Sequence, residues 1–193
     1  HVSTGEATEL IRNAKKKGIR VTAETTPHYF TLTEEAVADY STSAKMNPPL
    51  RTEEDRQAIR KGLQDGTFDA IATDHAPHSV LEKEVEFDVA ANGIIGLETA
   101  LPLSLGLVRD GLIGPSELVA LMSTNPAAVL NLPGGSLGEG DIGDVTVVDP
   151  EKRFVYTKDS IVSLGKNSPF IDWELQGKAV LTICGGKITC QDG

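Results

Sequence analysis

The spacing of apolar and polar positions predicts two amphipathic helices early in the chain. Residues 4–18 place apolar side chains at helical spacing between Thr4, which is suited to cap a helix, and Gly18, which is suited to end one. Residues 52–66 repeat this arrangement after Thr52, with three acidic residues in the first turn. Both segments are therefore predicted to be surface helices with one buried face.

Two strands are predicted beside these helices. Residues 19–24 alternate between apolar and polar, and residues 68–73 form a nearly continuous apolar run, typical of a strand buried on both faces of a parallel sheet. Between them lie a short helix after Thr33 and an extended segment at 45–50, which two prolines stiffen. Helices that alternate with strands in this way favour βα units around a parallel sheet.

The pattern changes after residue 73. A charged segment without clear periodicity reaches about residue 95, and two or three helices are expected after it, at 97–107, 116–122 and 126–130. Five glycines follow residue 133 within ten positions, and short strands come after them. We therefore predict an α/β part at residues 1–132 and a small β-rich module at residues 133–193. The strands expected in the module are 144–148, 154–156, 179–184 and 187–190.

Composition and charge exclude several classes of function. The chain has 193 residues, of which 39% are hydrophobic and 24% charged, with a formal net charge of -10. Such an acidic surface repels phosphate backbones, so no nucleic-acid partner is expected. No run of about 18 apolar residues occurs, so no membrane partner is expected either. Cys184 and Cys190 are too few for a disulfide framework, which favours free thiols in a reducing cytoplasm.

The richest candidate chemistry follows the apolar run at 68–73. Asp74, His75 and His78 come directly after it. Polar residues at the carboxyl ends of strands in a parallel barrel face the mouth of the active site. An Asp at this place can bind a metal and exchange a proton with water. Taken alone, the short motif is better explained by a helix cap or an ion pair in a loop, because short motifs recur by chance.

The order and spacing of several segments resemble the dihydroorotase family of bacterial type, in the amidohydrolase superfamily. The resemblance extends over nearly the whole chain, and no single segment is decisive. The matching segments are His1-Val2-Ser3, Thr26-Pro27-His28, Met46-Asn47-Pro48-Pro49-Leu50-Arg51, Asp74-His75-Ala76-Pro77-His78, the run from Gly93 to Thr99, Ser123-Thr124-Asn125-Pro126-Ala127, the run from Gly143 to Asp149, and Asn167-Ser168-Pro169-Phe170.

The resemblance implies a fold and a reaction. The fold would be the carboxyl-terminal part of a (β/α)8 TIM barrel of the amidohydrolase type, with a small β module that completes a composite β domain. The intact site would hold one or two zinc ions. The reaction would be the reversible hydrolysis of the cyclic amide of dihydroorotate to N-carbamoyl-aspartate, in pyrimidine biosynthesis.

The resemblance also assigns roles to residues. His1 and Asp74 would bind metal, and Asp74 would also be the general base that moves a proton from the nucleophile to the departing ring nitrogen. Asn47 would contact the substrate ring, although a turn residue before Pro48 explains it equally well. His78 and the backbone near Asn92 and Gly93 would bind the substrate carboxylate. The family has an apolar-Gly pair where this chain has Asn92-Gly93.

Five other residues are expected to support the structure. His28 is interpreted as a structural residue near the site, and His75 as lying outside the set of ligands. We expect Arg51 to form an ion pair, Met46 to pack in the core, and Trp173 to lie in the core of the small module.

Residues 79–92 are expected to be mobile without substrate and to order over the pocket when the substrate binds.

Other ligands of the family's site are missing from this sequence. The family uses a His-X-His on its first strand, and no His-X-His occurs here. The chain also opens at His1 with a helix signal directly behind it, as expected of a chain cut within a domain. Since a zinc site needs at least three protein ligands, this chain alone is expected to be inactive.

Two alternative functions and one further assembly stay open from the sequence. A hydantoinase or allantoinase would share the metal chemistry and the Pro-Pro turn, although the Asn before Pro48 and the second His four residues after Asp74 favour dihydroorotase. An inactive homologue could instead serve as a scaffold for aspartate transcarbamoylase. A homodimer is the other assembly considered.

Overall fold

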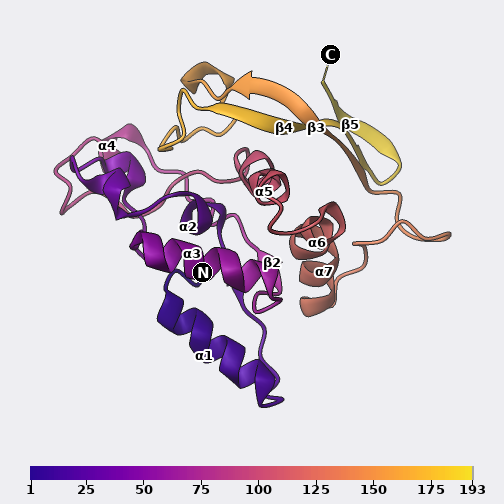
Figure 1. Ribbon diagram of the computed structural model, residues 1–193. Coiled ribbons are helices and arrows are strands. Elements are labelled where there is room, and N and C mark those ends of the chain that lie inside the picture. Colours follow the sequence, from indigo (N-terminus) through magenta and orange to yellow (C-terminus); the bar gives the residue numbers. More distant parts are fainter. Residues whose placement is uncertain (193) are drawn as a thin grey trace.

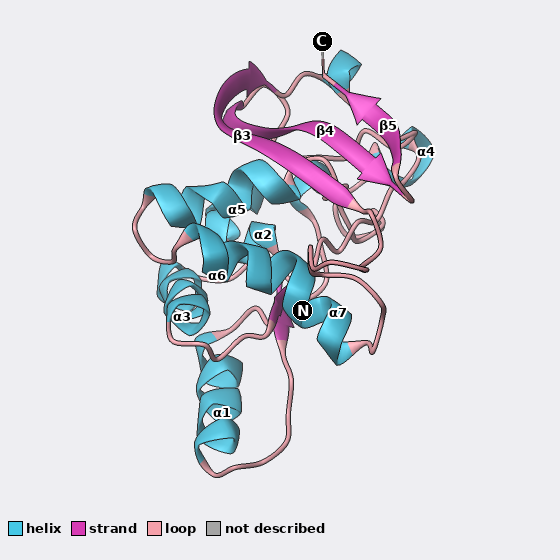
Figure 2. Ribbon diagram, turned by 90° about the vertical axis from the view of Figure 1, so that its right-hand side faces the viewer, coloured by secondary structure: helices cyan, strands magenta, loops and turns pink. Residues whose placement is uncertain are grey.

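The computed structural model describes residues 1–192, in which short helices surround a small parallel pair of strands and carry an antiparallel sheet (Figures 1 and 2). No helix in this range is long and apolar enough to cross a membrane. The helices are α1 Gly5–Lys16, α2 Pro27–Thr31, α3 Glu53–Gln64, α4 Val80–Lys83, α5 Ala100–Arg109, α6 Pro115–Val119 and α7 Asn125–Val129, with short 3-10 helices η1 Glu34–Val37, η2 Thr42–Ala44 and η4 Lys158–Ser160 and a π-helix η3 Ala120–Thr124. The strands are β1 Glu24–Thr25, β2 Ala70–Ile71, β3 Val145–Val155, β4 Glu174–Cys184 and β5 Lys187–Gln191.

The two amphipathic helices form as the sequence predicts. The Thr4 hydroxyl accepts a hydrogen bond from the amide of Ala7 at 3.2 Å and so caps α1. The Thr52 hydroxyl caps α3 in the same way, accepting from the amide of Asp55 at 3.3 Å. The two helices pack against each other, as Figure 1 shows. Local capping and periodicity therefore set both helices.

The predicted parallel strands are shorter than expected. β1 pairs with β2 in parallel, with Glu24 opposite Ala70 and Thr25 opposite Ile71. Residues 19–23 form no strand, so the expectation for residues 19–24 is wrong over most of its length. A strand is defined by its ladder to a neighbour, and among residues 1–192 the ladder between these segments is limited to Glu24–Thr25 and Ala70–Ile71. The amide of Val2 also donates to the carbonyl of Glu24 at 3.0 Å, which places the first residues beside β1.

The small module is a three-stranded antiparallel sheet in the order β3-β4-β5. The strands predicted at 144–148 and 154–156 are one strand, β3, and β4 begins five residues before the predicted strand at 179. The register shifts between Val147 and Val148 and again between Asp149 and Arg153. These irregularities accommodate Pro150, which has no N–H to donate to the ladder.

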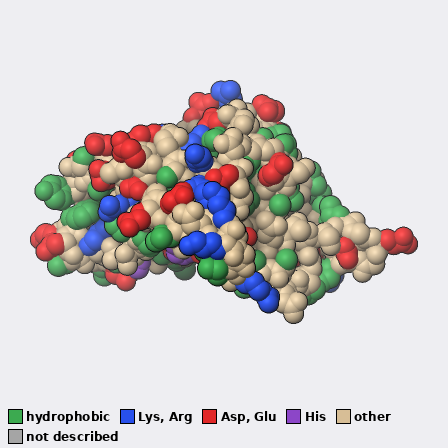
Figure 3. Space-filling view, turned by 60° about the horizontal axis from the view of Figure 1, so that its bottom comes forward, with side chains coloured by type: hydrophobic (Ala, Val, Ile, Leu, Met, Phe, Trp, Pro, Cys, Tyr) green, Lys and Arg blue, Asp and Glu red, His purple; other side chains and the backbone are tan. Residues whose placement is uncertain are grey.

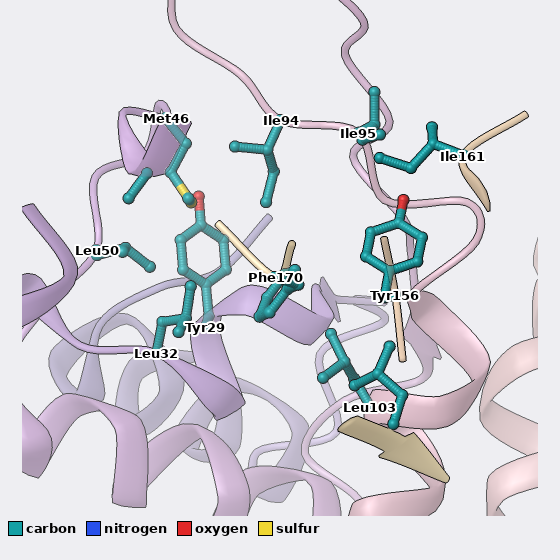
Figure 4. Packing of buried hydrophobic residues seen from close by; sticks show 12 residues of the cluster. Tyr29, Leu32, Met46, Leu50, Ile94, Ile95, Leu103, Tyr156, Ile161 and Phe170 are labelled. Carbon is teal, nitrogen blue, oxygen red and sulfur yellow. The ribbon is translucent and has the colours of Figure 1, made fainter. Parts of the chain in front are cut away.

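The α/β part and the module share one core. Tyr29, Ile94 and Leu103 from the first part pack with Tyr156 and Phe170 from the second, as Figure 4 shows. Phe170 is 1% exposed, and its burial stabilises the fold by about 2–3 kcal/mol. Helix α5 lies against β4 at this junction, as Figures 1 and 2 show. The two parts therefore fold against each other, whatever boundary the sequence pattern suggests at residue 133.

Candidate active site

Four ionisable side chains from distant positions gather beside the parallel strands. The Nε2 atom of His1 lies 3.4 Å from Oδ1 of Asp74, and Nδ1 of His1 lies 2.7 Å from Oε1 of Glu24. The second oxygen of Asp74, Oδ2, lies 3.8 Å from Nε2 of His28. The expected approach of His1 to Asp74, which are 73 positions apart in the sequence, is thus observed.

The carboxyl ends of the strands position this cluster. Glu24 belongs to β1, His1 precedes the Val2 amide that bonds to β1, and Asp74 follows β2 by three residues. The amino-terminus lies beside the small pair of parallel strands in Figure 2. Because parallel strands end at the same edge of a sheet, side chains at these ends come together.

Burial determines the charge state of the groups around Asp74. It raises the pKa of the Asp74 carboxyl, a shift that the carboxylate of Glu24 reinforces. Burial also lowers the pKa of His28 to about 3, so this imidazole is neutral at pH 7. The His28 ring, 2% exposed, is paired with the Thr26 hydroxyl at 2.7 Å. The His28 ring therefore lies beside Asp74 as a neutral imidazole, and its structural role stays a prediction.

The geometry of His1 and Asp74 fits two ligands of one metal ion. A tetrahedral zinc ion holds N and O ligands at about 2.0–2.1 Å, which places two ligand atoms about 3.3 Å apart. The observed 3.4 Å agrees with this spacing. Glu24 accepts from the other nitrogen of His1, an arrangement that fixes the ring orientation of metal-bound histidines. Among residues 1–192, no group of three or more His, Cys, Asp or Glu side chains is placed so that it could hold a metal ion, so these two would be part of a larger set.

A second group of expected residues lies on the loops after Asp74. Nε2 of His78 donates to the carbonyl of Asn92 at 2.9 Å, and Nδ1 lies 3.5 Å from the carboxylate of Glu82. Gly93 has a φ of 128°, and a Cβ atom there would lie 2.5 Å from Cβ of Ala76. The structure thus brings His78, Asn92 and Gly93 together. Glycine is required at position 93 because the loop that carries it touches the loop of residues 76–78.

Segment 79–92 contains more structure than its sequence pattern indicates. Helix α4 lies within it, with a capping box between Ser79 and Glu82. The ammonium of Lys83 donates to the carbonyls of Ala91 at 2.8 Å and Gly93 at 3.0 Å. Lys45 donates to three further carbonyls at the end of the segment, those of residues 87, 88 and 90. Its mobility stays a prediction.

The remaining expected residues occupy varied environments. Asn47 is exposed, as a residue that contacts a substrate would be. Nδ1 of His75 accepts from the amides of Gly96 and Leu97, so this ring holds a turn. Arg51 lies 3.6 Å from Asp55, Met46 is buried in the core, and both agree with expectation.

Three features of this region differ from the expectations or were missed. Trp173 was expected in the core of the module but is 40% exposed, stacking edge-on against Phe170. Glu24 was missed, although a carboxylate at the end of a predicted strand is a signal that could have identified it. Asn167, whose side chain bonds to the loops of His78 and Gly93, was identified only as part of a motif.

On the face seen in Figure 3, side chains of both charges are interspersed and histidine atoms lie near the lower margin.

Comparisons with known proteins place these features in context. A family model described as "Amidohydrolase family" matches residues 1–189. The chain is 61% identical over 187 residues to a dihydroorotase of Desulfotalea psychrophila, covering 97% of this chain and 44% of that protein. It is 58% identical over 192 residues to a dihydroorotase of Syntrophus aciditrophicus, covering 100% of this chain and 45% of that protein. The chain thus spans less than half the length of these curated relatives.

A solved structure also resembles the fold closely. The L-hydantoinase (dihydropyrimidinase) of Arthrobacter aurescens matches with a TM-score of 0.94 and 31% identity, over 100% of this chain and 44% of that one. The similarity in sequence is therefore greater to the two dihydroorotases, while the backbone also fits the hydantoinase.

Proposed function

Because the chain belongs to the amidohydrolase family, we propose that it supplies part of the active site of a metal-dependent dihydroorotase. Its fold is part of a (β/α)8 barrel of the amidohydrolase type with a small β module, as the sequence predicted. The observation that carries the proposal is the approach of His1 to Asp74 at 3.4 Å, at the carboxyl ends of parallel strands. The 61% identity to a dihydroorotase supports the choice of substrate.

His1 and Asp74 are the proposed metal ligands, and zinc is the proposed metal. The imidazole and carboxylate donors suit zinc, and the other ligands would come from outside residues 1–192. When bound, such an ion polarises a carbonyl and lowers the pKa of water to about 7. Glu24 would hold the His1 ring so that Nε2 faces the ion.

Asp74 is the proposed general base. One of its oxygens lies toward His1, and the other lies toward the neutral His28 ring without a strong partner at 3.8 Å. This second oxygen can accept a proton from the nucleophilic water and deliver it to the ring nitrogen as the amide bond breaks. Because burial lowers the pKa of His28 to about 3, its imidazole is too weak a base to compete for this role.

Substrate recognition is assigned to Asn47, His78, Asn92 and Gly93. An exposed Asn47 has both a donor and an acceptor for an imide-like ring. His78 offers a ring N–H to a carboxylate once it exchanges its bond to the Asn92 carbonyl. The Gly93 amide is bonded to the carbonyl of Lys45 at 3.0 Å, so Gly93 contributes the close turn rather than that donor.

The substrates, location, domain division and protein contacts are part of the same proposal. Dihydroorotate and N-carbamoyl-aspartate are the proposed small-molecule partners, with the cytoplasm as location. Residues 1–132 and 133–193 are proposed as the barrel part and the β module. A homodimer and an assembly with aspartate transcarbamoylase are the protein contacts to test.

A hydantoinase is the second candidate, favoured by the TM-score of 0.94 to the hydantoinase structure. The deciding experiment uses the purified full-length protein loaded with zinc and compares turnover of dihydroorotate, hydantoin and allantoin. We expect dihydroorotate to be preferred by at least about a hundredfold in kcat/KM, since a site built for a carboxylate discriminates against rings that lack one. A preference for hydantoin would replace the proposal, and no turnover of any ring in metal-loaded protein would favour a scaffold.

A further inference from the structure

Asn167 links the two loops of the proposed substrate site through its side chain. It lies in the β module, between η4 and β4, and is 5% exposed. Its Nδ2 atom donates to the carbonyl of Ala76 at 2.9 Å and to that of Gly93 at 3.1 Å. Its Oδ1 atom accepts from the amide of His78 at 3.0 Å. One buried amide therefore bonds to both loops.

The chemistry of these bonds requires an amide of this length. The Asn side chain has two N–H donors and one carbonyl acceptor, and all three functions are satisfied here. Asp has the same shape but has no N–H group and would place negative charge against two carbonyls. The backbone of Asn167 adds a fourth bond, since its carbonyl accepts from the amide of Ile95 at 3.0 Å.

The surrounding packing shows how closely the three segments approach. A Cβ atom on Gly165 would lie 2.9 Å from Cβ of Pro77 and 3.0 Å from the amide nitrogen of His78. A Cβ atom on Gly93 would lie 2.5 Å from Cβ of Ala76 and 3.2 Å from Nε2 of His78. Glycine is thus needed on both sides, and Asn167 bonds across the contact that the glycines permit.

We propose that Asn167 is a positioning residue for substrate binding, which sets His78 and the Asn92–Gly93 turn at the spacing that a substrate carboxylate requires. The inference rests on the proposed function. It assigns the β module a part in recognition, since its Asn167 lies 74 to 91 positions after the residues it holds.

A purely structural role predicts a different outcome. If Asn167 only stabilises the fold, its loss lowers the folded fraction and leaves the KM of the folded enzyme unchanged. If it positions the carboxylate pair, KM rises while kcat changes little, because Asp74 and His1 are not among the groups it touches. The division between KM and kcat therefore separates the two roles.

The test uses the zinc-loaded full-length protein with Asn167→Asp, and Asn167→Ser as a second variant should the first fail to fold. Ser168→Ala is the matched control, since Ser168 is buried in the same turn and its hydroxyl accepts from the Phe170 amide at 3.2 Å. We expect Asn167→Asp to raise the KM for dihydroorotate by at least about tenfold, with kcat within about threefold and zinc content unchanged. The control should keep both constants within about twofold.

Hydrogen exchange provides a readout that does not depend on turnover. In Asn167→Asp, the amides of residues 76–78 and 92–95 should exchange faster together, and in Ser168→Ala they should not. An unchanged KM in a folded variant, or equal changes in variant and control, would overturn the inference. If the wild-type protein fails to turn over dihydroorotate, the proposed function fails, while the paired change in exchange still decides whether Asn167 holds both loops.

Discussion

Asp74 combines an unusual backbone conformation with its proposed chemistry. Its φ is 46°, in the left-handed region that most L-residues avoid, although Asp and Asn tolerate it. The chain thus turns sharply after β2 while the carboxylate stays beside His1 at 3.4 Å. Because Asn accepts the same backbone, an Asp74→Asn change alters charge and basicity without straining the turn.

We expect Asp74→Asn in the full-length protein to lower kcat at least about a hundredfold, the low end for a positioned acid–base group. The KM for dihydroorotate should change less, because His78 and Asn47 are unaltered. Steady-state kinetics with metal analysis checks this, and exposed Asp39→Asn is the control. Near-normal turnover at normal zinc content would show that another group is the base.

Glu24 gives a second prediction at this scale. Replacing its carboxylate by an amide, Glu24→Gln, weakens the 2.7 Å contact that orients His1, so zinc affinity should fall about 10- to 100-fold. Competition against a chelator measures the affinity without any assay of turnover. Glu54→Gln, exposed on α3, should bind zinc like the wild type. Equal affinities for all three proteins would remove Glu24 from the site.

Residues of the candidate site differ in how far the sequence identifies them. Asp74 and His1 belong to motifs, so the resemblance found both. Glu24 could have been found, since it ends a predicted strand and faces the same edge. Asn167 could not be placed, because nothing local indicates that its amide meets residues 74 to 91 positions earlier.

At the scale of elements, segment 79–92 depends on a buried ammonium group. Lys83 is 4% exposed, and burial lowers its pKa to about 8, with the charge of Lys45 acting in the same direction. The ordinary value for lysine is 10.5. Between these values the unfolded chain retains a proton that the folded protein has released. The free energy of unfolding should therefore rise with pH across this window.

The slope expected from one such proton is at most about 1.4 kcal/mol per pH unit. Urea unfolding of the full-length protein at about pH 7.5 and about pH 9.5 measures it, with Lys83→Met as the variant that lacks the group. Relative to Lys83→Met, the wild type should gain stability toward the higher pH. A constant difference between the two proteins would mean that Lys83 keeps an ordinary pKa.

Elements with local signals were predicted best. Helices α1 and α3 carry caps and periodicity, and their bounds agree with the sequence to within about two residues. The strand expected at 19–24 is mostly absent, because its extent depends on a neighbour rather than on its own residues. β3 is one strand where the sequence pattern predicts two, and its register shifts around Pro150.

At the scale of the whole molecule, the shared core predicts cooperative behaviour. Phe170 comes from the module but packs among residues of the α/β part, so Phe170→Ala should lower the free energy of unfolding by about 3–5 kcal/mol. Unfolding of the full-length protein, followed by near-UV circular dichroism and by hydrogen exchange in both parts, should give coincident transitions. Two separate transitions, with only the later one sensitive to Phe170→Ala, would instead support independent domains divided at residue 133.

The long-range bonds of Asn167 also bear on how the protein is made. A ribosome adds about 5–20 residues per second, so His78 emerges roughly 4 to 18 s before the asparagine that fixes its loop. During that interval the nascent chain already contains His1 and Asp74 but has no means of setting the spacing of the carboxylate pair. Substrate recognition would therefore mature only after Asn167 has been synthesised, and a chain terminated before this residue would lack it.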